Sequence, residues 1–340
     1  MKPGCSSSNI GITAGEFRPT RLNRREFLVS SSAAVWAGTV LAGSGCTTRR
    51  STDKIPDLIW GRRGFSEGRL QKPRAMAISD QDEVYLVDIL GRIQVYTHEG
   101  EFLRGWRTPM IAQGKPTGLA IGQDGSLLVP DTHYYRVLFY SSDGVLDESR
   151  TIGGINGDGP GEFHFVTDVV QDARGHFLVG QYGQIDRIQE FSPSGEFIRM
   201  WGTQGSEFGE FSRPQSLIVD GSGLLWVADA CNHRIQVFDV SGAELQPELV
   251  DCWGKPGSLS GQLQYPYGLI FDHDGTLLVV ENGNHRVQRF DRSGRPLEMW
   301  GTVGKDPGQF LKPWALGLDS QRRLQVLDTQ NHRVQRFDLG

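Results

Sequence analysis

The chain has 340 residues, enough for one large core or two ordinary ones, and its 44 glycines alternate with apolar segments, which is typical of many tight turns rather than of disorder. Its formal net charge is −5; the first 46 residues carry a surplus of three positive charges, so the remainder stands at −8. An acidic body lacks electrostatic attraction for phosphate backbones, and we therefore expect no nucleic-acid partner.

Residues 1–46 have the pattern of a targeting segment. Arg24 and Arg25 precede Phe27 and Leu28, and an uncharged stretch rich in Ala, Ser and Gly follows. This resembles a twin-arginine export signal, which implies an extracytoplasmic protein, in the periplasm or at the cell surface. An uncleaved membrane anchor is the alternative, because the stretch is just long enough to span a bilayer.

The cysteines leave two questions open. Cys46 ends the N-terminal segment, before a polar linker over residues 47–55. A lipoprotein signal would carry its lipid at Cys46, but Gly43 stands where such signals usually have Leu, so the sequence does not decide on lipidation. Cys231 and Cys252 are the cysteines of the body; we expect two partly buried free thiols, although an extracytoplasmic setting permits a disulfide.

Residues 56–340 contain six copies of one pattern. The first five copies have four short apolar runs joined by glycine-containing turns, and the fourth run ends in Trp-Gly or a variant of it; the sixth copy has three such runs. Aligned on one arginine, the copies are 44–52 residues apart. These arginines are Arg92, Arg136, Arg187, Arg234, Arg286 and Arg333. Four antiparallel strands per copy predict an all-β fold, a six-bladed β-propeller.

The two ends of the repeat complement each other. The last copy stops at Phe337-Asp338 without a Trp-Gly run, and an unmatched Trp60-Gly61 precedes the first copy. We expect this N-terminal strand to complete the C-terminal blade and to close the ring without an open edge. We also expect the residue before the glycine to pack between neighbouring blades. Around the ring these residues are Trp60, Trp106, Ile152, Trp201, Trp253 and Trp300.

The repeat reads P-x-G-[LIV]…L-x-V-x-D-x-x-N-H-R-[VI]-Q-x-F…W-G and resembles the NHL repeat over residues 55–340, closely in the last three copies and loosely in the first three. The resemblance implies a six-bladed propeller. The histidines of the triplet, His233, His285 and His332, occupy equivalent positions on different blades. We expect each to pack or hydrogen-bond within its own blade, because ligands of one metal ion must converge on a point.

An acidic residue precedes the loop in five copies, and we expect it to pair with the repeated arginine and to brace the loop. These acidic residues are Asp88, Asp131, Asp229, Glu281 and Asp328. The third copy reads QYGQIDR instead, so its loop should have a different shape.

Function is expected where the copies differ. The residue after the proline, or after Val166 in the third copy, starts the innermost strand, and these residues should surround the mouth of the central channel. Around the ring these residues are Arg74, Thr117, Thr167, Gln215, Tyr267 and Trp314, with Asp168 one position further on. Further candidates in nearby loops are His164, Phe165, Tyr134 and Tyr135. They predict a site for a small ligand or a peptide; the alternative is that they line a wet channel.

Two functions remain open. The first is a non-catalytic, monomeric module that binds a protein, peptide or glycan through the mouth. The second is an enzyme, because the NHL-type propeller is also the scaffold of peptidylglycine amidating lyase, whose metal-binding histidines lie near the starts of inner strands. That family's Pro-His-Asp resembles Val166-Thr167-Asp168. The aspartate matches and the histidine does not, so no zinc site transfers, while calcium near Asp168 stays open.

Overall fold

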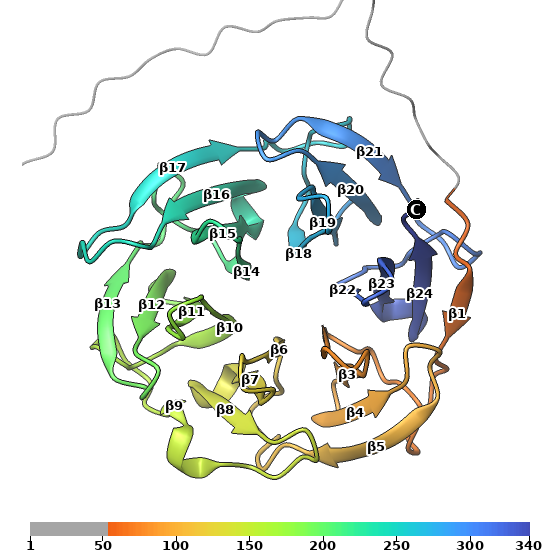
Figure 1. The fold of residues 1–340 in the computed structure, drawn as a ribbon, viewed down its shortest axis with the longest axis horizontal. Helices are drawn as coiled ribbons and strands as arrows, with labels where there is room; N and C mark the ends of the chain where they lie inside the picture. The colour runs from red at the N-terminus through yellow and green to blue at the C-terminus, as the bar shows by residue number, and fades with distance from the viewer. Residues whose placement is uncertain (1–53) are drawn as a thin grey trace, which may run out of the picture. The chain divides into compact units, whose positions relative to one another are not determined.

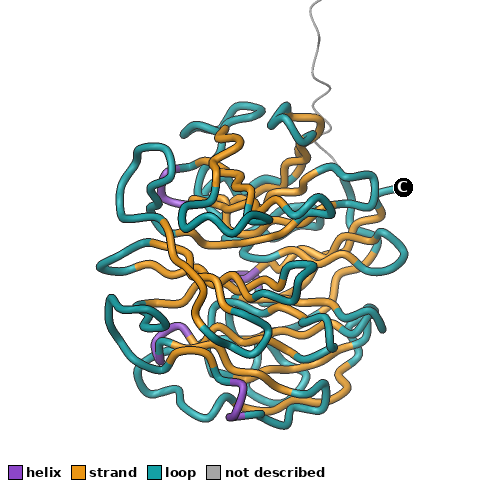
Figure 2. The backbone as a smooth tube through the Cα atoms, turned by 60° about the vertical axis from the view of Figure 1, so that its left-hand side comes forward, coloured by secondary structure: helices purple, strands orange, loops and turns teal. Residues whose placement is uncertain are grey.

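The computed structural model describes residues 54–340. In it, 24 strands form six four-stranded antiparallel sheets that follow one another around a ring (Figure 1). The strands fill the body of the ring, and the connecting loops lie around its outside (Figure 2). The predicted six-bladed propeller is thereby confirmed. The expected signal segment, Cys46 and most of the linker lie outside the described residues.

The first three blades are built in chain order from the innermost strand outward. Blade 1 contains β2 (Ala75–Ile78), β3 (Val84–Val87), β4 (Arg92–Tyr96) and β5 (Phe102–Arg107). Blade 2 contains β6 (Ala120–Ile121), β7 (Leu127–Asp131), β8 (Arg136–Tyr140) and β9 (Ile152–Gly153). Blade 3 contains β10 (Phe165–Gln171), β11 (Phe177–Tyr182), β12 (Arg187–Phe191) and β13 (Phe197–Trp201).

The next two blades repeat this order, and the last is completed from the other end of the chain. Blade 4 contains β14 (Pro214–Val219), β15 (Leu224–Asp229), β16 (Arg234–Asp239) and β17 (Glu248–Trp253). Blade 5 contains β18 (Pro266–Phe271), β19 (Leu277–Glu281), β20 (Arg286–Phe290) and β21 (Pro296–Trp300). Blade 6 contains β22 (Leu316–Leu318), β23 (Arg323–Asp328), β24 (Arg333–Asp338) and, as its outer strand, β1 (Leu58–Trp60).

The N-terminal strand joins the last blade by antiparallel pairing. Ile59 lies opposite Gln335 and Trp60 opposite Val334, and Figure 1 shows β1 beside β24 at the edge of the ring. Four 3-10 turns complete the described secondary structure: η1 (Thr132–Tyr134), η2 (Glu148–Arg150), η3 (Ala230–Asn232) and η4 (Thr329–Asn331). No helix within residues 54–340 has the length and apolar character needed to cross a membrane.

The core consists of layers between neighbouring blades, and aromatic pairs mark them. In five blades the tryptophan of the outer strand packs against a ring on the third strand of the next blade, with centroids 4.9–6.2 Å apart. The pairs are Trp60–Tyr96, Trp106–Tyr140, Trp201–Phe238, Trp253–Phe290 and Trp300–Phe337. Ile152 packs in the equivalent cluster with Phe191. The expected packing between blades is confirmed.

The repeated acidic residue and arginine form ion pairs in five blades, with N–O distances of 2.5–3.0 Å. The pairs are Asp88–Arg92, Asp131–Arg136, Asp229–Arg234, Glu281–Arg286 and Asp328–Arg333. In blade 4 the same guanidinium also donates to the carbonyls of Glu207 and Glu210 in the connection that enters the blade. The predicted bracing is confirmed; blade 3 differs as expected, because Gln181 replaces the acid there and accepts from Arg187.

The three histidines of the repeat do not stay within their own blades, and this expectation was wrong. Each Nδ1 accepts a backbone N–H from the connection that enters the next blade. The donors are Tyr265 to His233 (3.1 Å), Lys312 to His285 (3.0 Å) and Lys72 to His332 (2.9 Å). These donors have positive φ, between 44° and 51°, and precede the proline of the inner strand. The left-handed turn directs the N–H toward the histidine of the preceding blade. An alignment of the copies does not show this hydrogen bond, because it joins two different copies. We call these three contacts the histidine clasps.

The histidine clasps predict acid sensitivity. Burial lowers the pKa of His233, His285 and His332, so each folded-state pKa lies below the unfolded value of about 6.5. The contribution of the three histidines to the free energy of unfolding is therefore fully present above the unfolded-state pKa. It is lost as the pH falls through the folded-state pKa values. We expect the triple His→Gln variant to lose about 1–3 kcal/mol at pH 7.5, measured by urea unfolding, and to lose less than the wild type on acidification to pH 5.

The control for this experiment is His273→Gln, since His273 is exposed. Burial raises the pKa of Asp131 to about 6 and that of Asp168 to about 7. The contribution of these carboxyls to the free energy of unfolding increases as the pH falls, which is opposite in sign to the contribution of the histidines. The difference between the triple variant and the wild type isolates the clasps. Equal loss of stability on acidification in both chains would contradict the prediction.

Candidate functional site

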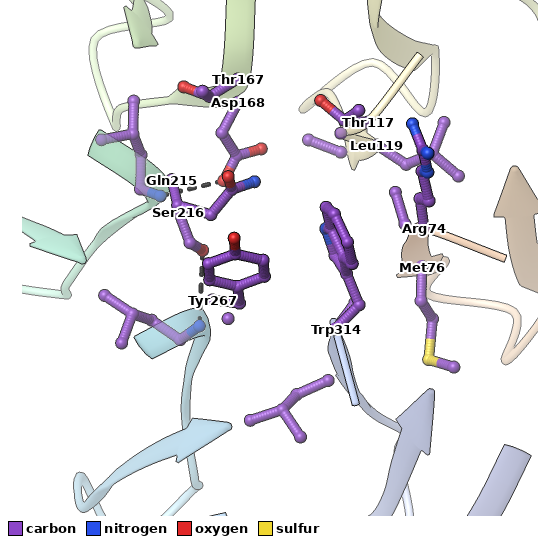
Figure 3. A pocket seen from close by; sticks show the side chains of 18 of the residues that line it. Arg74, Met76, Thr117, Leu119, Thr167, Asp168, Gln215, Ser216, Tyr267 and Trp314 are labelled. Atoms are coloured by element: carbon purple, nitrogen blue, oxygen red, sulfur yellow. Dashed lines mark hydrogen bonds between the residues drawn. The ribbon is translucent and has the colours of Figure 1, made fainter. Parts of the chain in front are cut away.

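The six inner-strand residues predicted from the sequence surround one pocket on the axis of the ring. Each blade contributes one of them: Arg74, Thr117, Thr167, Gln215, Tyr267 and Trp314. Asp168 and the equivalent small residues of the other blades form the next layer, and the cavity has a volume of about 130 Å³. We call it the central pocket. Figure 3 shows the rings of Tyr267 and Trp314 pointing toward its middle.

Aromatic rings and guanidinium groups alternate along one side of the central pocket. Tyr267 and Trp314 meet edge to face with centroids 4.8 Å apart, and Arg74 lies 5.7 Å from the centre of the Trp314 ring. Arg213 lies 5.4 Å from the ring of Tyr267 and 4.7 Å from that of Tyr182, and its Nε donates to Gln215 at 2.8 Å. These contacts hold the rings in place from both sides, which pre-organises them for a ligand.

Asp168 is the acidic residue of the central pocket. Its Oδ1 accepts from the backbone N–H of Val169 at 3.0 Å and its Oδ2 from that of Leu217 at 2.9 Å, so it also links blades 3 and 4. Burial raises its pKa to about 7, against the opposing effect of these hydrogen bonds. Calcium requires six to eight oxygen ligands. A single carboxylate with both oxygens already accepting does not fit that ion, so the structure does not favour the calcium site left open above.

The further candidates from the loops do not line the central pocket. His164 is buried, and its Nε2 lies 2.7 Å from Asp158 Oδ1. Phe165 packs against His133 and Tyr182, with centroids 5.1 and 5.2 Å apart. The Tyr134 hydroxyl accepts from the N–H of Gln113, and Tyr135 takes the left-handed position at the end of η1. These side chains support the loops around the pocket.

Sequence reasoning missed Arg213, which touches both Tyr267 and Gln215. A signal for it exists in the residue before each inner-strand proline, or before Val166 in blade 3. Four of the six connections carry a cation at this position: Lys72, Lys115, Arg213 and Lys312. Four cations at equivalent positions are unexpected in a body with a net negative charge. This cluster could have been found by aligning the copies.

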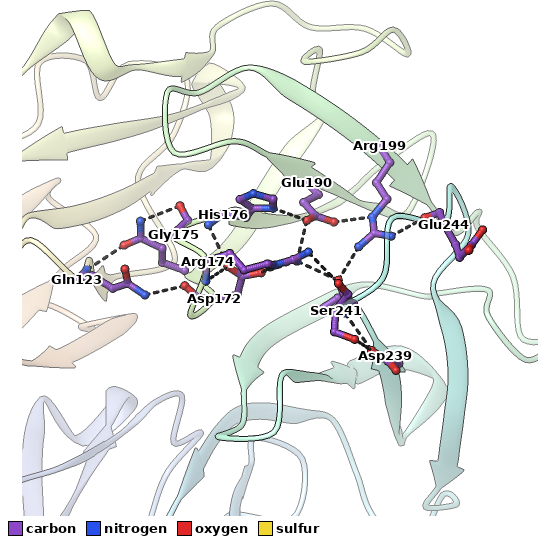
Figure 4. A network of polar contacts seen from close by, with 12 residues as sticks. Gln123, Asp172, Arg174, Gly175, His176, Glu190, Arg199, Asp239, Ser241 and Glu244 are labelled. Atoms are coloured by element: carbon purple, nitrogen blue, oxygen red, sulfur yellow. Dashed lines mark hydrogen bonds and ion pairs between the residues drawn. The ribbon is translucent and has the colours of Figure 1, made fainter.

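A second cluster of titratable groups lies in blade 3 (Figure 4). Oxygen and nitrogen atoms of Asp172, His176 and Glu190 lie within 4.8 Å of one another, a spacing that could hold a metal ion. However, Arg174 pairs with both carboxylates and Arg199 with Glu190. The charges are therefore already compensated, and we interpret the cluster as an ion-pair network.

This network joins two blades. Arg174 and Arg199 both donate to the carbonyl of Val240, at 2.9 and 2.8 Å, in the turn that follows β16 of blade 4. The side chains of Glu190 and Arg199 are 1% and 2% exposed, so the interaction lies in the protein interior.

The two cysteines of the body are free. Cys231 is exposed and Cys252 is half-buried, so the expectation of two partly buried thiols holds for Cys252 only. Desolvation by the surrounding protein raises the pKa of both thiols, that of Cys231 as well although part of this residue is exposed, and this disfavours the reactive thiolate.

A ring of six four-stranded antiparallel blades defines the class of six-bladed β-propellers. In a comparison with protein families, residues 211–238, the segment around the triplet of blade 4, match the NHL repeat. The chain is similar to human NHL repeat-containing protein 3, with 28% identity over 212 residues, which cover 58% of this chain and 57% of that protein.

The chain is also similar to peptidyl-glycine alpha-amidating monooxygenase A of Xenopus laevis, with 37% identity over 191 residues, 54% of this chain and 19% of that protein. It thus spans somewhat more than half the length of the first relative and about a fifth of the second. Among solved structures, a streptogramin B lyase superimposes with a TM-score of 0.58 at 12% identity, covering 85% of this chain and 97% of the other. Virginiamycin B lyase from Staphylococcus aureus superimposes with a TM-score of 0.54 at 17% identity, covering 78% of this chain and 84% of the other. At these identities the structural matches show the fold alone.

Proposed function

We propose that this chain is an exported, monomeric, non-catalytic recognition module that binds a protein, peptide or glycan through the central pocket and its mouth. One observation carries the proposal: the inner-strand positions at which the six copies differ in chemistry converge on a single pocket. Residues fixed by the repeat brace blades, whereas a cation, two aromatic rings and an amide around one cavity form a set of polar and apolar groups suited to a ligand. The match to the NHL repeat supports an interaction module.

The similarity to peptidyl-glycine alpha-amidating monooxygenases supports an alternative, a propeller lyase or hydrolase. The pocket supports it less well. Among the described residues that line it, Asp168 is the single one with a carboxylate, imidazole or thiol. Acid–base catalysis and metal binding usually need more than one such group. Turnover by the purified body that is lost in Asp168→Ala would favour the enzyme.

The proposal includes export to the periplasm or cell surface. The paired Arg24-Arg25, with the Phe27-Leu28 pair and the uncharged stretch that follow, supports it. The segment would then be cleaved, lipidated at Cys46 or retained as an anchor. Fractionation of cells expressing the Arg24→Lys, Arg25→Lys double variant tests this step, since the variant should stay in the cytoplasm.

The binding proposal predicts the outcome of a capture experiment. The triple variant Arg74→Ala, Tyr267→Ala, Trp314→Ala should lose the partner that the immobilised wild-type body captures from envelope extract, because it removes the side chains that surround the pocket. The expected loss is tenfold or more, as alanine substitution at a buried interface centre costs about 2 kcal/mol or more.

The matched control replaces three exposed hydrophobic residues on outer strands, Leu103, Ile198 and Leu297, with alanine. This variant should keep the partner. Unchanged capture by the mouth variant, together with a wild-type melting temperature, would show that the mouth is the wrong surface.

A further inference from the structure

Arg74 and Arg213 are two neighbouring cations of the mouth. Within residues 54–340 neither guanidinium forms an ion pair, and that of Arg74 donates no hydrogen bond. Arg74 is half-buried. Burial lowers its pKa, and the like charge of Arg213 lowers it further. A desolvated cation beside another cation is unfavourable unless an anion compensates them.

The remaining charges around Arg74 add to this imbalance. Burial lowers the pKa of His133 and the charge of Arg74 lowers it further, and the Nδ1 of this imidazole is buried without a partner. Asp168 is the carboxyl of the pocket lining, and Figure 3 places it across the cavity from Arg74. Asp186 accepts the backbone N–H of Arg213, and the nearby guanidinium partly offsets the burial that raises the pKa of Asp186, so Arg213 is partly compensated whereas Arg74 is not. The net charge of the body is −8, so this group of cations is local and does not continue a basic surface.

The aromatic rings of the pocket limit the kind of chemical group that can carry an anion to Arg74. Trp314 lies between Arg74 and Tyr267, and its Nε1 is buried with no hydrogen-bond partner. The cavity of about 130 Å³ holds a small group rather than a large ligand. A planar group against the rings would place a single anionic end near the guanidinium of Arg74. A doubly charged phosphate suits the site less well, because Asp168 would repel the second charge.

We infer that the central pocket recognises a carboxylate carried by a small planar group, as the end of the ligand that enters the mouth. The guanidinium of Arg74 pairs with the carboxylate, Arg213 adds long-range attraction, and Trp314 and Tyr267 pack against the planar part. This inference rests on the proposed function, since it names the chemistry recognised at the same mouth.

The experiment uses phenylacetate and its neutral counterpart phenylacetamide as probes, with the purified full body and isothermal titration calorimetry. Phenylacetate should bind at least about tenfold more tightly than the amide, and Arg74→Gln should remove this preference, since it removes the charge-assisted hydrogen bond to the carboxylate. The matched control is Lys72→Gln, an exposed cation two residues away that does not line the pocket. It should bind phenylacetate like the wild type.

The outcomes separate this inference from the proposed function. Equal affinity for acid and amide, or a preference that survives Arg74→Gln, overturns the carboxylate inference while the mouth can still bind a partner. Tighter binding of inorganic phosphate than of phenylacetate also overturns it. Equal loss in Arg74→Gln and Lys72→Gln would show a nonspecific charge effect and has the same consequence. Loss of the captured partner in Tyr267→Ala, Trp314→Ala but not in Arg74→Gln would retain the proposed function alone.

Discussion

Replacing Trp60 with alanine is expected to lower the free energy of unfolding by about 3–5 kcal/mol, the usual cost of truncating a buried aromatic residue. Trp60 lies on β1, a strand of only three residues, and is 7% exposed. Its ring contacts Tyr96 of blade 1 at 5.0 Å, and its Nε1 donates to Gln325 of blade 6 at 3.0 Å. One side chain thus contacts the last blade and the first, and few other contacts in β1 can replace it.

The measurement is equilibrium unfolding in guanidinium chloride, with Ile59→Ala as the control on the same strand. Ile59 is 38% exposed, and its truncation should change stability by less than about 1 kcal/mol. Trp60→Phe, which keeps a ring but loses the hydrogen bond, should fall between the two. If Trp60→Ala and Ile59→Ala cost the same, β1 does not hold the ring through this residue.

Glu190→Gln is expected to cost about 3–5 kcal/mol, because removing one partner of a buried ion pair leaves an uncompensated charge. The carboxylate of Glu190 pairs with Arg199, Arg174 and His176. A glutamine side chain has only one oxygen that accepts hydrogen bonds, so it cannot accept from all three. The loss should appear as weaker coupling of blades 3 and 4, since both arginines also donate to Val240.

The control for this second prediction is Glu196→Gln, at an exposed position in the turn between β12 and β13 of the same blade. It removes the same charge from the chain and should change the free energy of unfolding by less than about 0.5 kcal/mol. Indistinguishable urea midpoints for the two variants would mean that the network contributes no net stability.

The sequence was sufficient to predict the blades, the Asp–Arg bracing and the six residues of the central pocket. All of these depend on position within one copy: Arg234 lies five residues after Asp229, and Gln215 follows the proline of its copy. Once the copies are aligned, equivalent positions must face the same part of the ring, so the set around the axis follows.

Contacts between copies could not be predicted in the same way. His285 reaches Lys312 because the chain turns left-handed at Lys312, and a repeat pattern does not record which neighbour an N–H faces. A contact between copies in blade 3 was unpredictable for the same reason. Asp186 stands at the position of the repeat histidine and accepts the backbone N–H of Arg213. Glu190 stands where blades 5 and 6 have Arg289 and Arg336, a departure visible in the sequence whose partners only the folded chain defines.

The pairing of β1 with β24 determines the order in which the ring can form. Leu58 and Arg336 are neighbours in one sheet but lie nearly a full propeller apart in sequence, so the loop-closure entropy of the whole ring opposes this contact until the intervening blades are in place. Blades 1 to 5 are each local in sequence and can form as they are made, whereas blade 6 is expected to be the slow, final step. Residues 54–57 lead directly into β1, so the start of the described chain becomes fixed only when this last blade is completed.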